Sequence, residues 1–136
     1  MPDPFTDAQI EQLTGQINWQ LLQLERPSRS EYGSIRSGLS RADERLQAIA
    51  QATGEDAPTF LVRFREAARK DLCEEGGVLH AQWIRYHDLA SKDMLQTFGG
   101  ILIGLGLSGN ALSIVAVAVC VHVLYLGADA FCRGRA

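Results

Sequence analysis

Charged residues are absent from residues 94–128, which contain no Asp, Glu, Lys or Arg. Within that stretch, residues 98–126 are almost wholly apolar. An apolar run longer than about 18 residues is long enough to cross the hydrocarbon core of a bilayer. The absence of charge therefore predicts a membrane segment in the C-terminal part of the chain, in the layout of a tail anchor.

Other absences exclude whole classes of function. The formal net charge is −3 and the chain has no basic field, so we expect no nucleic acid partner. His80 and His87 share a predicted helical face, but no recognised metal-ligand spacing is present. No Ser or Cys nucleophile motif occurs either. We therefore expect no enzymatic activity, no metal and no other cofactor.

Cysteine is also scarce, because the chain has only Cys73, Cys120 and Cys132. Their number is odd and their spacings are wide. The N-terminus has neither the basic nor the apolar part of a signal peptide. We therefore expect free thiols in place of a disulfide framework, and a cytoplasmic location for the N-terminal region.

Residues 1–93 carry apolar side chains at helical spacing, and they show no alternation typical of strands. Thr6 and Gln9 form a capping box at the start of one helix. Asp56 is placed to cap another helix, and a further one is expected from about Val78. The pattern predicts an N-terminal bundle of about four amphipathic helices.

The most regular apolar stripe lies in the second predicted helix and alternates steps of three and four residues. Such a narrow seam packs either within a bundle or against another subunit, and we favour packing within the bundle. The seam comprises Tyr32, Ile35, Leu39, Ala42, Leu46 and Ile49.

The membrane segment, residues 94–130, has alternative conformations. A single helix over 94–128 would be about 52 Å long, well beyond a hydrocarbon core of about 30 Å. A turn at residues 108–110 would instead give a helical hairpin. Period-two runs within the segment also resemble strands, so a strand pair is a third alternative. Residues 131–136 form a short polar tail.

Small residues recur through this segment at spacings of four and seven. Small side chains let transmembrane helices approach each other closely. We therefore predict an interface between membrane helices, in a homo-oligomer or with a membrane protein partner. Its predicted members are Gly99, Gly100, Gly104, Gly106, Gly109, Asn110, Ser113, Ala116 and Cys120.

Two further features of the segment bear on function. Gly104, Gly106 and Gly109 spell G-x-G-x-x-G, the dinucleotide-binding fingerprint, but the helix that follows is apolar all round and no further parallel strands follow it. We therefore reject nucleotide binding.

Asn110 and His122 are polar side chains deep in the segment, and such residues are candidate functional sites.

Together these patterns predict an all-α membrane protein. An N-terminal amphipathic helical bundle is followed by a C-terminal transmembrane or membrane-inserting helix or helical hairpin. We expect the protein to contact membrane lipid and to self-associate, as a pore-forming or membrane-perturbing effector. A regulatory or adaptor subunit of a membrane complex is one alternative. The other is a soluble helical interaction protein with a buried apolar C-terminal helix.

Overall fold

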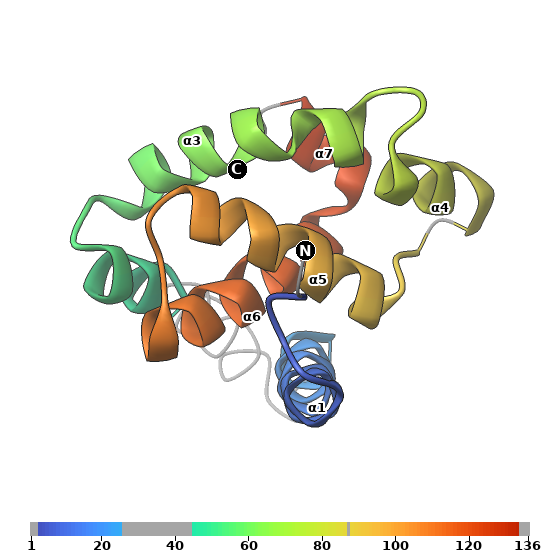
Figure 1. Ribbon diagram of the computed structural model, residues 1–136. Coiled ribbons are helices and arrows are strands. Elements are labelled where there is room, and N and C mark those ends of the chain that lie inside the picture. Colours follow the sequence, from blue (N-terminus) through green and yellow to red (C-terminus); the bar gives the residue numbers. More distant parts are fainter. Residues whose placement is uncertain (1–2, 26–44, 87, 134–136) are drawn as a thin grey trace, which may run out of the picture.

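The computed structural model describes residues 3–25, 45–86 and 88–133 (Figure 1). These residues form helices joined by short turns, and none of them forms a strand. The prediction of an all-α fold is confirmed. A strand pair is wrong, because residues 115–123 are helical and residues 101–107 pass from a helix into a turn.

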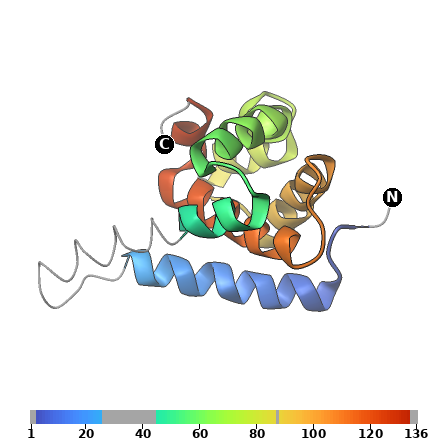
Figure 2. The same ribbon diagram turned by 90° about the vertical axis from the view of Figure 1, so that its left-hand side faces the viewer.

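Helix α1 (Asp7–Glu25) begins at the predicted capping box. The Thr6 N–H donates to Gln9 Oε1 at 2.9 Å, and the Gln9 N–H donates to Thr6 Oγ1 at 3.2 Å. Helix α1 runs along one side of the domain and packs against α6 (Gly109–Leu126) (Figure 2). Its buried residues are Ile10, Leu13 and Ile17.

Helix α3 (Ala57–Ala68) begins where the sequence places its cap. The Asp56 carboxylate accepts a hydrogen bond from the Thr59 N–H at 3.2 Å, which satisfies one of the free donors at the helix start. Helix α3 continues directly into a π-helix, η1 (Arg69–Cys73). Helix α3 packs against the hairpin described next, and η1 packs against the helices that precede and follow that hairpin in the chain.

The apolar segment folds as a helical hairpin. Its arms are α5 (Ser91–Gly104) and α6, and residues 105–108 join them. The turn comes earlier in the chain than predicted, because α6 already begins at Gly109 with Ser108 as its extended N-cap residue. A single helix through the segment is therefore wrong for this fold. The expected domain boundary at residue 94 falls inside α5.

Helix α4 (Val78–Tyr86) stands at the edge of the domain and does not run on into the hairpin (Figure 1). The Gln82 side chain bridges the break between α4 and α5. Gln82 Oε1 accepts from the Ala90 N–H at 3.0 Å, and Gln82 Nε2 donates to Asp93 Oδ2 at 2.6 Å. These bonds fix the break that the sequence pattern did not reveal.

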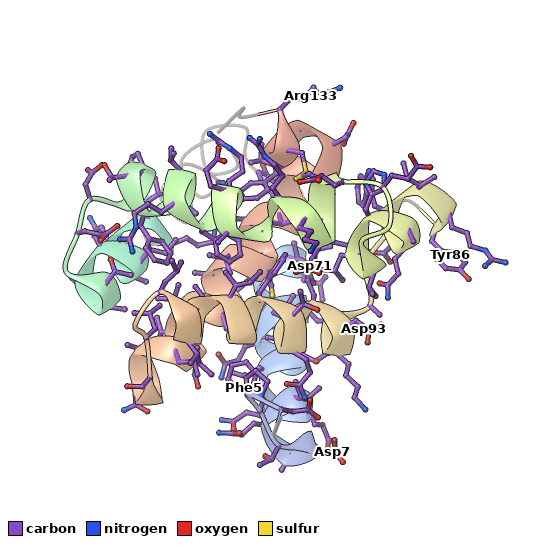
Figure 3. All side chains as sticks on the ribbon, turned by 45° about the horizontal axis from the view of Figure 1, so that its top comes forward. Phe5, Asp7, Asp71, Tyr86, Asp93 and Arg133 are labelled. Atoms are coloured by element: carbon purple, nitrogen blue, oxygen red, sulfur yellow. A yellow bond between two sulfur atoms is a disulfide. The ribbon has the colours of Figure 1, made fainter. Side chains whose placement is uncertain are left out.

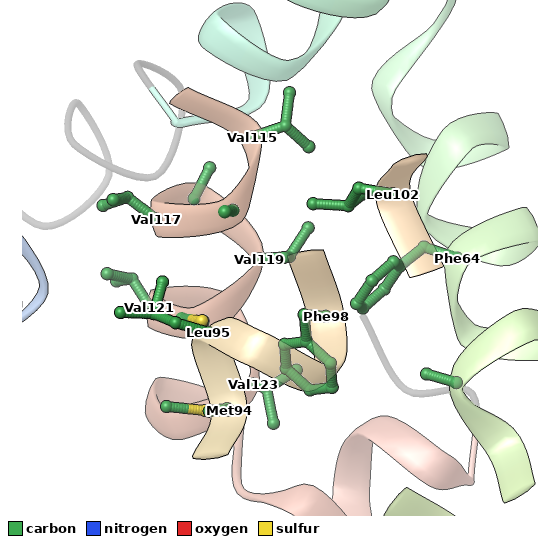
Figure 4. Close-up of a cluster of buried hydrophobic side chains, with 14 of the residues drawn as sticks. Phe64, Met94, Leu95, Phe98, Leu102, Val115, Val117, Val119, Val121 and Val123 are labelled. Atoms are coloured by element: carbon green, nitrogen blue, oxygen red, sulfur yellow. The ribbon is translucent and has the colours of Figure 1, made fainter. Parts of the chain in front are cut away.

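Helix α6 lies at the centre of the hydrophobic core. Nine of its residues are buried, and it packs against α1, α5 and the short helix α7 (Ala128–Cys132). Figure 4 shows the valines of α6 beside Phe98 and Leu102 of α5. The Phe98 ring meets the Phe64 ring of α3 edge-on, with their centroids 5.0 Å apart. The hairpin is thus enclosed by the helices that precede and follow it.

A disulfide joins Cys73, at the end of η1, to Cys132, at the end of α7. The expectation of free thiols is wrong for this pair and right for Cys120, which is free and buried. The two cysteines are 59 residues apart in sequence, and only the fold brings their Cα atoms to 5.6 Å. That separation is within the range that a disulfide requires.

Removing this disulfide is expected to destabilise the domain. It closes a loop of about 60 residues, which lowers the entropy of the unfolded chain by an amount worth roughly 4 kcal/mol at 25 °C. We expect Cys73→Ser with Cys132→Ser to lower the free energy of unfolding by about that amount in urea titrations. Reduction of the wild-type protein should give the same loss of stability, which would show that the loss comes from the missing bond and not from the serine side chains. A loss below about 1 kcal/mol in both would contradict the assignment.

Candidate functional site: the apolar hairpin and its base

Among the described residues, α6 is the one helix long and apolar enough to cross a membrane by length and composition. Half of it is buried inside the domain, as in the core helix of a soluble protein. At 1.5 Å per residue, the arms α5 and α6 extend about 21 Å and about 27 Å. The longer arm approaches the thickness of a hydrocarbon core.

The tip of the hairpin is exposed and carries no charge. Ile103, near the end of α5, is 49% exposed, and Ile114, near the start of α6, is 48% exposed. Residues 104–110, which comprise the turn and the adjoining ends of both arms, are exposed or half-buried and include no Asp, Glu, Lys or Arg. The hairpin therefore presents an uncharged end to solvent while much of its length is covered.

The predicted small-residue interface divides into separate environments in this fold. Its exposed members are Gly100, Gly104, Gly106, Gly109 and Asn110. Ser113 is half-buried, whereas Gly99, Ala116 and Cys120 are buried. The turn at 105–108 prevents these residues from sharing one face of one helix. An interface between copies in a membrane stays a prediction.

Gly99 has a role within the domain that the sequence did not suggest. A Cβ atom at this position would lie 2.8 Å from Phe5 Cε2 and 2.9 Å from Pro4 Cβ, so glycine provides the space in which the N-terminal segment docks. Gln96 fixes the same segment, because its amide donates to the Phe5 carbonyl at 3.0 Å and accepts from the Phe5 N–H at 3.2 Å. Figure 3 shows Phe5 beside α5.

The base of the hairpin contains a cluster of polar and aromatic side chains around His122. The His122 ring meets the Phe131 ring edge-on at 5.9 Å, and the Arg45 guanidinium lies over the Tyr125 ring at 5.7 Å. Burial and the charge of Arg45 lower the pKa of His122 to about 4 in the folded domain. Burial also lowers the pKa of Arg45, against the effect of Tyr125. Asn110 lies at the other end of α6, so the two predicted polar residues do not meet.

Acid is therefore expected to destabilise the domain through His122. Its pKa of about 4 in the folded domain is below the ordinary 6.5, so the unfolded chain binds more protons between these values. The stability from neutral His122 is complete above pH 6.5 and is lost as the pH falls through the range from 6.5 to about 4. The loss is roughly 3 kcal/mol.

Thermal or urea unfolding of the wild type and of His122→Leu across this pH range provides the measurement. Leucine keeps an apolar side chain of similar size and cannot titrate. The difference in stability between the two proteins should therefore change by roughly 3 kcal/mol over the range. A constant difference would show that His122 does not control the acid response.

The predicted seam is only partly described. Leu46 and Ile49 belong to a helical segment over residues 45–53, where Leu46 is half-buried and Ile49 is buried in the core. The remaining members lie outside the described residues: Tyr32, Ile35, Leu39 and Ala42. The two described members pack inside the domain.

Sequence reasoning missed the residues that close the base of the hairpin. Phe131 is buried against Phe64, with ring centroids 6.1 Å apart, and the disulfide follows at Cys132. Their partners, Phe64 and Cys73, lie more than fifty residues earlier in the chain than Phe131 and Cys132, so no local spacing could reveal them. Among the described residues, no group of three His, Cys, Asp or Glu side chains is placed to hold a metal ion. His87 lies outside the described residues.

No protein-family model, no curated protein and no solved structure matches this chain. The hairpin, its exposed tip and the disulfide at its base are the features that bear on function.

Proposed function

We propose that this chain is a non-enzymatic, membrane-active protein that stores the α5–α6 hairpin in a folded domain and inserts it into a lipid bilayer. The observation that carries the proposal is the exposed, charge-free tip of a hairpin with no charged residue from position 94 to its end. Inserted hairpins self-associate and perturb the membrane, as a pore-forming effector does. Their small residues support close contact between helices in lipid.

The disulfide supports entry as a hairpin with its tip first. Cys73 precedes the hairpin and Cys132 follows it, so the oxidised chain meets a bilayer with both ends of the hairpin held together and its tip free. A single crossing between them would place them on opposite sides. Because disulfides persist in oxidising compartments, the bond also supports an extracytoplasmic location in place of the cytoplasmic one expected from the N-terminus.

The energetics support insertion only after the domain opens. Fourteen Leu, Ile and Val residues between positions 101 and 126 contribute about −4 to −8 kcal/mol on the scale for insertion into a membrane. Nine residues of α6 are already removed from water in the folded domain, so much of this gain is realised before any membrane is met. A change that uncovers the hairpin is therefore part of the proposed mechanism.

The burial of α6 favours a second candidate, a soluble helical interaction protein whose core contains this helix. Trp19 and Leu22 on α1 are 63% and 58% exposed, and large apolar side chains on a surface suit contact with another protein. In this case the hairpin stays within the domain and the protein does not partition into lipid.

Flotation with phospholipid vesicles, followed by protease digestion, distinguishes the two candidates. The full-length protein is incubated with vesicles of neutral and anionic phospholipid, with and without a thiol reductant, and at pH 7 and pH 4.5. We expect it to float in at least one opened condition. Mass spectrometry should then find residues 94–128 protected from proteinase K. Protein that stays at the bottom of the gradient in every condition would refute membrane insertion and leave the soluble candidate.

A further inference from the structure

The disulfide encloses the hairpin in a covalent loop. The loop begins at the end of η1, passes through α4, α5 and α6, and closes at the end of α7. Helix α7 packs against η1, and Figure 1 shows it beside the C-terminal end of α3. The bond therefore fastens the α3–η1 unit to the C-terminal end of the hairpin.

This bond is one of two features that hold α7 in position. It has only five residues, and a helix of that length is not stable alone. Gly127, which separates it from α6, has a φ of +92°, a conformation that favours glycine and breaks the helical path. Apart from the disulfide, burial of Ala128 and Phe131 holds α7 in place.

Helix α3 contacts both the hairpin and α7 through a single ring. Phe64 of α3 packs against Phe98 of α5 and Phe131 of α7, with ring centroids 5.0 Å and 6.1 Å away. For the hairpin to leave the core together with α7, α3 must separate from both rings. A covalent bond between η1 and α7 opposes that separation directly.

We propose that the Cys73–Cys132 disulfide is a redox latch: while intact it ties η1 to α7 and so holds α3 against the α5–α6 hairpin, and its reduction frees the hairpin from that cover. Delivery of the freed hairpin to a bilayer rests on the proposed function, whereas opening of the domain does not. The latch sulfurs suit exchange chemistry, because Cys73 and Cys132 are only half-buried.

The reductant is a dithiol. One of its thiolates attacks a sulfur of the disulfide, which forms a mixed disulfide and releases the other cysteine. The second thiol of the reductant then displaces the first, so the reductant leaves as its own disulfide. Two electrons and two protons pass to the protein, and Cys73 and Cys132 become free thiols.

Cys120 provides a natural reporter of opening. It is fully buried on α6, and burial raises its pKa, so it is shielded from thiol reagents in the closed domain. It is the single free thiol in the oxidised wild type and also in the variant Cys73→Ser with Cys132→Ser. The labelling rate of Cys120 by a maleimide therefore compares the latched and unlatched domains with one reporter.

We expect the double-serine variant to be labelled at least tenfold faster than the oxidised wild type, with its helical circular dichroism retained. Ile49→Ala is the matched control, because Ile49 is 1% exposed and its truncation destabilises the core away from the latch. This variant should be labelled less than half as fast as the double-serine variant. Equal rates in the two variants, or no acceleration in the double-serine variant, would overturn the latch.

Vesicle flotation of the same proteins, with dithiothreitol-reduced wild type added, separates the latch from the proposed function. Faster labelling together with flotation only in the proteins that lack the disulfide supports both the latch and the proposed function. Faster labelling without flotation supports the latch and refutes membrane delivery. Flotation of the oxidised protein with unchanged labelling supports membrane binding and overturns the latch.

Discussion

Lysines at Ile103 and Ile114 are expected to abolish membrane insertion while leaving the folded domain intact. Both side chains are about half exposed, at 49% and 48%, so the ammonium groups reach water in the folded domain. During insertion the tip must pass through the hydrocarbon core, where each lysine costs roughly 2.5–3.5 kcal/mol. The pair therefore raises the barrier to passage of the tip by about 5–7 kcal/mol, which slows insertion more than a thousandfold.

The measurement is the fraction of Ile103→Lys, Ile114→Lys protein that floats with vesicles under the conditions in which the wild type floats. Val62→Lys is the matched control, because Val62 is 47% exposed on α3, outside the hairpin. The control should float like the wild type, and all three proteins should show the same thermal unfolding to within a few degrees. Flotation of the double variant at the wild-type level would show that the hairpin is not the part that enters the membrane.

Much of the fold follows from local signals in the sequence. The capping box at Thr6 and the cap at Asp56 mark helix starts because each satisfies backbone donors within one turn. The apolar faces of α1 and α3 follow from helical spacing. The hairpin is one of three interpretations of the apolar segment, and its predicted turn at residues 108–110 lies about three residues later than the observed turn at residues 105–108, since apolar residues on both sides hide its position.

Local signals in the sequence do not reveal the base of the candidate site. Cys73 and Cys132 are 59 residues apart, and nothing near either residue marks a pair. The small residues of the hairpin were interpreted as one helical stripe, whereas Gly99 accommodates Phe5 and Gly106 lies in the turn. The apolar composition of α6 predicts a helix, but it does not distinguish a core helix from a membrane helix. What covers a helix is decided by contacts remote in sequence.

Truncation of Phe64 is expected to cost more stability than any other single change to the cover of the hairpin. Phe64 is fully buried, and its ring contacts those of Phe60, Phe98 and Phe131 at centroid distances of 6.5, 5.0 and 6.1 Å. Burial of a large ring among three others puts Phe64→Ala near the upper end of the range for such truncations, about 5 kcal/mol. Urea titration of the oxidised protein gives the value.

Two matched variants test whether the loss of stability in Phe64→Ala comes from the buried ring of Phe64. Phe64→Leu keeps most of the apolar volume and should cost roughly 1–2 kcal/mol, because it removes the ring contacts without leaving a large cavity. Val62→Ala, on the exposed side of the same helix, should cost less than about 0.5 kcal/mol. Because Phe64 joins α3 to both α5 and α7, Phe64→Ala should also accelerate the labelling of Cys120 while the disulfide is intact. A loss below about 2 kcal/mol with unchanged labelling would show that α3 does not cover the hairpin as described.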